Sequence, residues 1–150
     1  MNDLIKKHTT LACGVDADKL EADMLDQPQV ECGLTHFFGP GVCVREVTIP
    51  AGTWMIGREH RYEHVGALLR GRLLFVSGDG FEVMESPTML LCKPGRKMAY
   101  AIEESVFQNI FATNETDIEK IEDHFTKKSE RFVAFQEEQK QKFLEENEVK

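Results

Sequence analysis

The chain has 150 residues, 41% of them hydrophobic, which suits one domain with a single core. Its formal net charge of −8 argues against general binding to nucleic acid or to an anionic membrane surface. No apolar run approaches the roughly 20 residues of a membrane-spanning helix, and residues 1–8 lack an apolar signal segment, so we expect the protein to stay in the compartment where it is made.

The first of three predicted regions is an N-terminal extension, residues 1–31, which is polar and acidic. Within it, Leu20, Met24 and Leu25 recur at helical spacing, and Pro28 follows shortly after them. We therefore predict a short helix that packs on the outside of the molecule.

Short strands separated by turn residues fill the second region, 32–113. Residues 42–49 alternate between two faces, and Gly78-Asp79-Gly80 has the composition of a hairpin turn. Turn signals recur at intervals of about eight to twelve residues, without a helical segment between them. The pattern predicts an all-β antiparallel sandwich or barrel and excludes parallel βαβ winding. Expected strands cover residues 34–38, 42–49, 68–69, 72–77, 81–85, 89–93, 97–102 and 106–112.

Helical signals return in the third region, residues 114–150. Thr116 and Glu119 have the spacing of a capping box, and Ser129 is placed to begin a second helix. That second helix is charged apart from an apolar set that includes Phe132, Phe135 and Phe143. We expect these phenylalanines either to dock on the protein's own barrel or to form an interface with a second subunit or another protein, a frayed tail being the remaining alternative.

Ionisable side chains concentrate between residues 49 and 73, and strand periodicity divides them into two sets. One set has charges of both signs, which suit a solvent-exposed face: Glu59, Arg61 and Glu63. The other set is expected to line a cavity inside the barrel: Arg58, His60, Tyr62 and His64.

This segment and the rhythm of the turns resemble the cupin family, whose fold is a jelly roll or double-stranded β-helix. The first cupin motif contains a glycine, His-x-His, a glutamate and a closing glycine; here Gly52 opens it and Gly71 closes it. At the family's histidine, histidine and glutamate positions the chain has Arg58, His60 and His64. Met98 takes the histidine position of the second motif. The resemblance covers roughly residues 40–112 and implies a cupin jelly-roll barrel with helical extensions at both ends.

A closer resemblance is to small stand-alone cupin-like proteins of tailed bacteriophages and prophages. The similar motifs are Val-Arg-Glu-Val-x-x-Pro-Ala-Gly from residue 44, Gly-x-x-His-x-x-Glu-His from 57, Gly-Arg at 71, Pro-Gly-x-Lys from 94 and Thr-Asp-x-x-x-x-Glu from 116. This resemblance implies a phage-encoded protein, located in the cytoplasm of an infected bacterial host or in the virion.

Two interpretations of the cavity stay open. A cupin metal needs three or four converging ligands, but on a flat strand His60 and His64 would lie about 13 Å apart, so they could share a metal only if the chain curls between them. Arg58 repels a divalent cation and Met98 is a soft donor, which favours a cavity without a tightly bound metal. Alternatively, the two histidines hold a divalent transition metal, with waters and one of three further side chains completing the site: Glu63, Tyr62 or Gln108.

The same side chains suit a small anion or a sugar hydroxyl, because guanidinium pairs well with carboxylate and phosphate. Tyr62 and Tyr100 would add hydroxyl contacts. We therefore expect a non-catalytic, oligomeric binding or assembly module with no catalytic residue. The alternative is a metal-dependent cupin enzyme, an isomerase or dioxygenase acting on a small polar substrate through His60 and His64.

Overall fold

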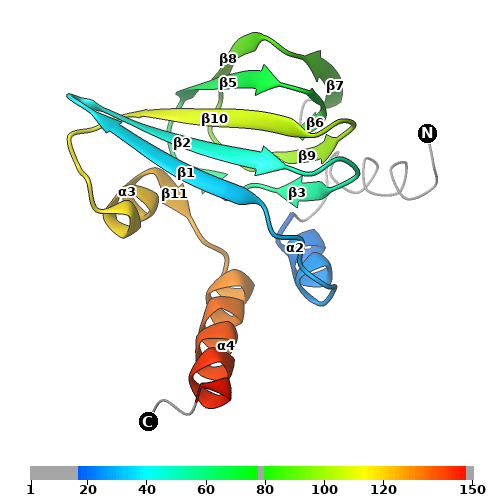
Figure 1. The fold of residues 1–150 in the computed structure, drawn as a ribbon, viewed down its shortest axis with the longest axis vertical. Coiled ribbons are helices and arrows are strands. Elements are labelled where there is room, and N and C mark those ends of the chain that lie inside the picture. The colour runs from blue at the N-terminus through cyan, green and yellow to red at the C-terminus, as the bar shows by residue number, and fades with distance from the viewer. Residues whose placement is uncertain (1–16, 78–79, 148–150) are drawn as a thin grey trace.

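Two antiparallel β-sheets form the body of the protein in a computed structural model that describes residues 17–77 and 80–147 (Figure 1). In that part of the chain the larger sheet has five strands, in the spatial order β1 (Gly33–Gly39), β2 (Val42–Ile49), β10 (Ser105–Ala112), β5 (His64–Arg70) and β8 (Thr88–Cys92). The smaller sheet has four, in the order β3 (Trp54–Ile56), β9 (Met98–Ala101), β6 (Arg72–Ser77) and β7 (Gly80–Glu85).

The chain crosses repeatedly from one sheet to the other. It passes from β2 to β3, from β5 to β6, from β7 to β8, and from β9 to β10, changing sheet each time. Every pairing in both sheets is antiparallel. This crossing order is that of a jelly-roll barrel, so the predicted all-β fold class is confirmed.

Alternating burial explains why the sequence forms these strands. On β2, Cys43, Val47 and Ile49 are buried while the residues between them are not. Val47 and Ile49 join Leu68, Leu73 and other side chains of both sheets in the main core. The predicted hairpin between β6 and β7 is formed, with Ser77 opposite Gly80, although its two turn residues, 78–79, lie outside the described residues.

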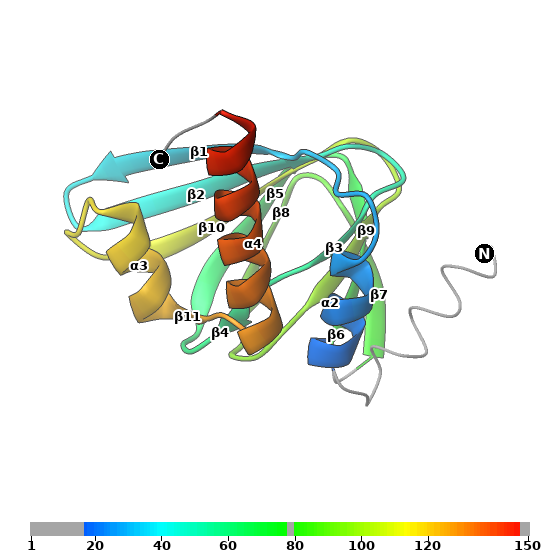
Figure 2. The same ribbon diagram turned by 90° about the horizontal axis from the view of Figure 1, so that it is seen from below.

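Three helices gather at one end of the barrel, where the two sheets diverge (Figure 2): α2 (Ala17–Leu25), α3 (Ile118–Phe125) and α4 (Glu130–Glu146). The predicted helix before Pro28 is confirmed as α2, and Leu20 buries its side chain against Leu74, Val76 and Met98. Residues 1–16 of the predicted N-terminal extension lie outside the described residues. None of the helices in the described ranges is long and apolar enough to cross a membrane.

The two C-terminal helices begin at side-chain caps. Ser129 caps α4 as predicted, since its hydroxyl accepts a hydrogen bond from Phe132 N. The prediction of Thr116 as the cap of α3 is wrong: Asp117 caps it by accepting from Lys120 N at 3.2 Å. The Thr116 N–H instead donates to the Glu115 carboxylate, which holds Thr116 outside the helix.

The phenylalanines of α4 lie at different depths. Phe132 and Phe135 are half-buried, whereas 61% of Phe143 is exposed, and no residue of α4 is fully buried. α4 lies beside α2 rather than against a sheet (Figure 2). Docking on the protein's own structure therefore accounts for only part of this apolar set.

Candidate functional site

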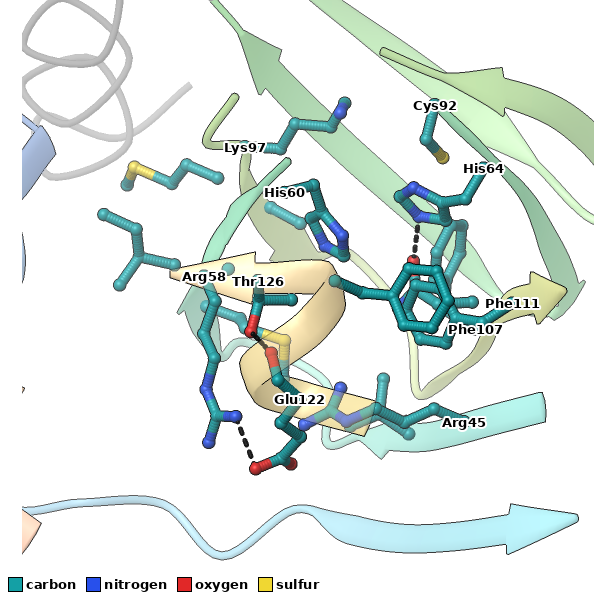
Figure 3. Close-up of a pocket in the computed structure, with 18 of the residues that line it drawn as sticks. Arg45, Arg58, His60, His64, Cys92, Lys97, Phe107, Phe111, Glu122 and Thr126 are labelled. Carbon is teal, nitrogen blue, oxygen red and sulfur yellow. Dashed lines mark hydrogen bonds and ion pairs between the residues drawn. The ribbon is translucent and has the colours of Figure 1, made fainter. Parts of the chain in front are cut away.

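A cavity of about 270 Å³ opens at the end of the barrel that the helices cover (Figure 3). Both sheets, α3 and α4 contribute to its wall. Apolar side chains such as Leu73, Phe107 and Phe111 form its floor and sides. Its polar side chains include Arg45, Arg58, His60, His64, Lys97 and Asn109.

His60 and His64 meet in this cavity because the chain turns sharply between them. His60 ends the short strand β4 (Glu59–His60), residues 61–63 form a turn, and His64 begins β5. The two imidazole rings stack with their centroids 4.3 Å apart and their planes at 24°. The chain therefore curls between His60 and His64, which is the condition under which the two side chains were expected to meet.

Tyr62 lies in that turn, and its predicted place in the cavity is wrong. Half of its surface is exposed, and its ring packs outside the cavity against His124 and Phe125. The strand periodicity that assigned it inward does not continue through residues 61–63, because the chain is not extended there.

Tyr100 is likewise absent from the cavity wall, so its predicted hydroxyl contact is wrong. Its ring packs on Trp54, with the centroids 5.0 Å apart, in the cluster beneath α2. Met98, two residues earlier on β9, reaches the cavity wall but also packs against Leu20 in that cluster. β9 therefore gives the cavity an apolar edge rather than a hydroxyl.

The two histidines are held in their neutral forms. The pKa of His60 is lowered to about 3, mainly by burial and further by its neighbours His64, Lys97, Arg45 and Arg58, all of which disfavour a positive charge on its ring. Burial also lowers the pKa of His64. Its hydrogen bonds to Asn109 and to the Tyr62 backbone act in the opposite direction, but burial has the larger effect. His64 Nε2 lies 2.7 Å from Asn109 Oδ1, whereas the buried His60 Nδ1 has no hydrogen-bond partner among the described residues.

The Glu122 carboxylate lies between the guanidinium groups of Arg58 and Arg45, and of the two only Arg58 forms an ion pair with it (Figure 3). Arg58 Nη1 lies 2.7 Å from Glu122 Oε2, and its guanidinium sits 5.3 Å from the centroid of the Phe132 ring. Arg45, from the inward face of β2, has no ion pair or hydrogen bond within the described ranges. Burial lowers the pKa of Arg45, the nearby Arg58 charge lowers it further, and Glu122 partly compensates.

The donor set does not fit a cupin metal with three protein ligands. Nowhere in the described part of the chain do three or more His, Cys, Asp or Glu side chains converge to hold a metal ion. Neither of two expected additional ligands lines the cavity. Glu63 is exposed in the turn, and Gln108 donates a hydrogen bond to the Glu46 carboxylate at 2.9 Å.

Four residues that line the site were not predicted from the sequence as site residues: Arg45, Lys97, Asn109 and Glu122. Arg45 shares the inward face of β2 with Cys43, Val47 and Ile49, so an arginine among buried apolar residues was a detectable signal. Glu122 gave no comparable signal, because only the packing of α3 against the barrel brings it to the cavity.

No protein-family model matches the chain, and no curated protein matches it. Solved structures to which it is similar include KdgF from a Halomonas species, at 15% identity over 60% of this chain and 86% of that chain, with a TM-score of 0.48. A cupin superfamily protein from Desulfitobacterium hafniense has 10% identity over 61% and 85%, with a TM-score of 0.49. An acetylacetone dioxygenase from Acinetobacter johnsonii has 15% identity over 56% and 61%, with a TM-score of 0.47. At these identities the likeness concerns the fold alone.

Proposed function

We propose that the protein is a non-catalytic binding module whose barrel cavity takes a small anionic ligand. The observation that carries the proposal is the excess of positive charge at the cavity: Arg45, Arg58 and Lys97 line it together with two carboxylates, Glu122, which pairs with Arg58, and Glu21, which pairs with Arg96. Arg45 is left without an ion pair in the described ranges.

An anion would correct this imbalance. A guanidinium withdrawn from water without a partner is unfavourable, because it loses hydration and gains no compensating contact. The planar guanidinium fork matches the oxygens of carboxylate and phosphate groups. A ligand of this class would therefore bind where the folded protein leaves a positive charge uncompensated.

The histidines support the same proposal. Neutral His60 presents a buried Nδ1 without a hydrogen-bond partner among the described residues, so it is free to contact a ligand atom. A bound anion would also raise the depressed pKa of His60 by offsetting the surrounding positive charges. At about 270 Å³ the cavity lies at the lower end of the range for ligand sites, which favours a small molecule.

A thermal-shift series with acetate, inorganic phosphate and Zn²⁺ tests the proposal. At 100 times its dissociation constant, a ligand adds about 2.7 kcal/mol to the free energy of unfolding, which raises the Tm of a domain of this size by several degrees. We expect an anion to produce this shift, Arg45→Gln to abolish it and the exposed Arg70→Gln to retain it. If neither anion stabilises the wild-type protein, the proposal is wrong.

We further propose an assembly role for α4. Phe143 and Val133 are 61% and 51% exposed on a helix with no buried residue, which supports contact with a second copy or another protein. The motifs similar to those of phage proteins place this assembly, as part of the proposal, in an infected bacterial cell or in a virion.

The competing proposal is a metal-dependent isomerase or dioxygenase. Its supporting observation is the closeness of His60 and His64. Metal analysis of untagged protein separates the two proposals: one equivalent of iron, manganese, nickel or zinc per chain favours the enzyme, and its absence favours the binding module.

A further inference from the structure

We infer that the Glu122 carboxylate occupies the anion site in the ligand-free protein, and that the external ligand is a small carboxylate that displaces it from Arg58. The inference rests on the proposed function and names the ligand class. Its starting point is the placement of the Glu122 side chain between those of Arg58 and Arg45 (Figure 3).

The backbone of Glu122 is fixed independently of its carboxylate. On either side of it along α3, Ile121 is buried against Cys43, and Phe125 stacks on Phe111 with the ring centroids 4.7 Å apart. The Glu122 carbonyl accepts hydrogen bonds from the hydroxyl and the N–H of Thr126. The carboxylate can therefore leave Arg58 by rotation of its own side chain, while α3 stays in place.

Arg58 is also positioned without help from Glu122. The preceding residue, Gly57, donates its N–H to Lys97 O at 2.9 Å and accepts from Arg96 Nε at 3.0 Å. The ring of Phe132 covers the Arg58 guanidinium at 5.3 Å. The guanidinium would therefore keep its place after Glu122 had moved away.

The group already bound to Arg58 indicates the ligand class. A carboxylate already pairs with Arg58 at 2.7 Å, within reach of the charge on Arg45, yet Arg58 Nη1 makes no hydrogen bond with a described residue and could donate one to a better-aligned carboxylate. The pair is near the surface, with 22% of the Arg58 side chain and 16% of the Glu122 side chain exposed, so the outgoing carboxylate has water close by. Because Glu122 stays attached to α3, the incoming carboxylate is an additional negative charge beside Arg58 and Arg45, which offsets the excess of positive charge at the cavity.

Calorimetric titration of acetate at pH 7 into three proteins tests the inference. Glu122→Gln removes the competing charge and keeps the side-chain shape, while Glu119→Gln removes an equal charge from the exposed side of the same helix. We expect Glu122→Gln to bind acetate about tenfold more tightly than the wild type, because the ligand no longer displaces a charge-assisted contact. Glu119→Gln should bind as the wild type does, and inorganic phosphate should bind Glu122→Gln less tightly than acetate.

Each other outcome is decisive. Equal or weaker acetate binding by Glu122→Gln overturns the inference and leaves the proposed function intact, and tighter binding of phosphate than of acetate overturns the ligand class. Failure of both anions to bind the wild type and Glu122→Gln overturns the proposed function as well. If Glu122→Gln does not fold, carbon-detected NMR of the wild type decides: acetate must shift the carboxyl signal of Glu122 and leave that of Glu119 in place.

Discussion

The imidazole rings of His60 and His64 stack 4.3 Å apart, centroid to centroid, within a wall that also carries Arg45, Arg58 and Lys97. Protonation of either ring would add positive charge to a site that already has an excess of it. Protonation of these rings is therefore unfavourable in the folded state, which makes its stability dependent on pH.

We predict that the free energy of unfolding falls as the pH is lowered from 6.5 towards 3. The unfolded chain binds a proton on His60 near its ordinary pKa of 6.5, while the folded protein resists protonation until about 3, so acid favours the unfolded state throughout this window. Urea denaturation at pH 7, 6 and 5 measures the effect. His60→Gln should flatten the profile, and an unchanged slope in this variant would contradict the assignment to His60.

Arg45→Gln should stabilise the ligand-free protein by about 1 kcal/mol, because it removes a desolvated charge that lacks an ion-pair partner in the described ranges. Arg70→Gln is the control: the Arg70 side chain is 63% exposed and pairs with Glu104, so its loss should change stability by less than about 1 kcal/mol. Urea midpoints of the two variants and the wild type provide the measurement. Destabilisation by Arg45→Gln would show that this arginine supports the fold.

Gly71→Ala should destabilise the protein more than Gly41→Ala does. Both glycines have positive φ, 91° and 74°, so both substitutions carry about 1–2 kcal/mol of backbone strain. A Cβ on Gly71 would also overlap the Ser105 hydroxyl and the Glu104 carbonyl, whereas one on Gly41 meets nothing within 4 Å. We expect the overlap to add about 1–3 kcal/mol, and equal thermal midpoints for the two variants would contradict it.

Glu21→Ala should cost about 2–4 kcal/mol, because this buried carboxylate joins three parts of the structure. It accepts from Arg96 Nη2 at 2.8 Å and from the hydroxyl of Ser129, the cap of α4. Asp18→Asn is the control, since Asp18 is 67% exposed and pairs with the same arginine at 2.6 Å; its loss should cost less than about 1 kcal/mol. Hydrogen exchange should rise in the first turn of α4 in Glu21→Ala alone.

Phe143→Gln should lower the oligomeric state without lowering the Tm, because this side chain is 61% exposed and makes little contribution to the core. Lys140→Gln, an exposed substitution on the same helix, is the control. Light scattering after size exclusion gives the mass. A mass equal to that of the wild type would rule out Phe143 as an interface residue.

Local patterns in the sequence predicted most of the strands, but they missed β3 and found only residues 68–69 of β5. The alternation in Val42–Ile49 predicted both ends of β2, and the helical spacing around Leu20 predicted α2. Both predictions succeeded because the burial of one face of a strand or helix leaves a periodic pattern in neighbouring residues. Tyr62 shows the limit of this approach. A three-residue turn interrupts the strand at that point, and periodicity carried through the turn assigned the side chain to the wrong face.

The site itself depends on contacts between distant parts of the chain. His60 and His64 could be paired from the sequence because only a curl was needed to bring them together. The approach of Glu122 to Arg58 depends on how Ile121 and Phe125 pack against Cys43 and Phe111, and no local pattern encodes that packing.

The C-terminal segment pairs β11 (Thr126–Lys127) with β4 and completes the cavity wall. The late position of this segment in the sequence has a consequence for biosynthesis. Both large sheets have all their strands once the chain has reached Ala112, yet the cavity wall still lacks five contributors from the C-terminal segment: Ile121, Glu122, Phe125, Thr126 and Phe132. A nascent chain on the ribosome therefore forms the barrel before it forms the pocket. The complete cavity wall therefore requires the chain to have been synthesised at least as far as Phe132.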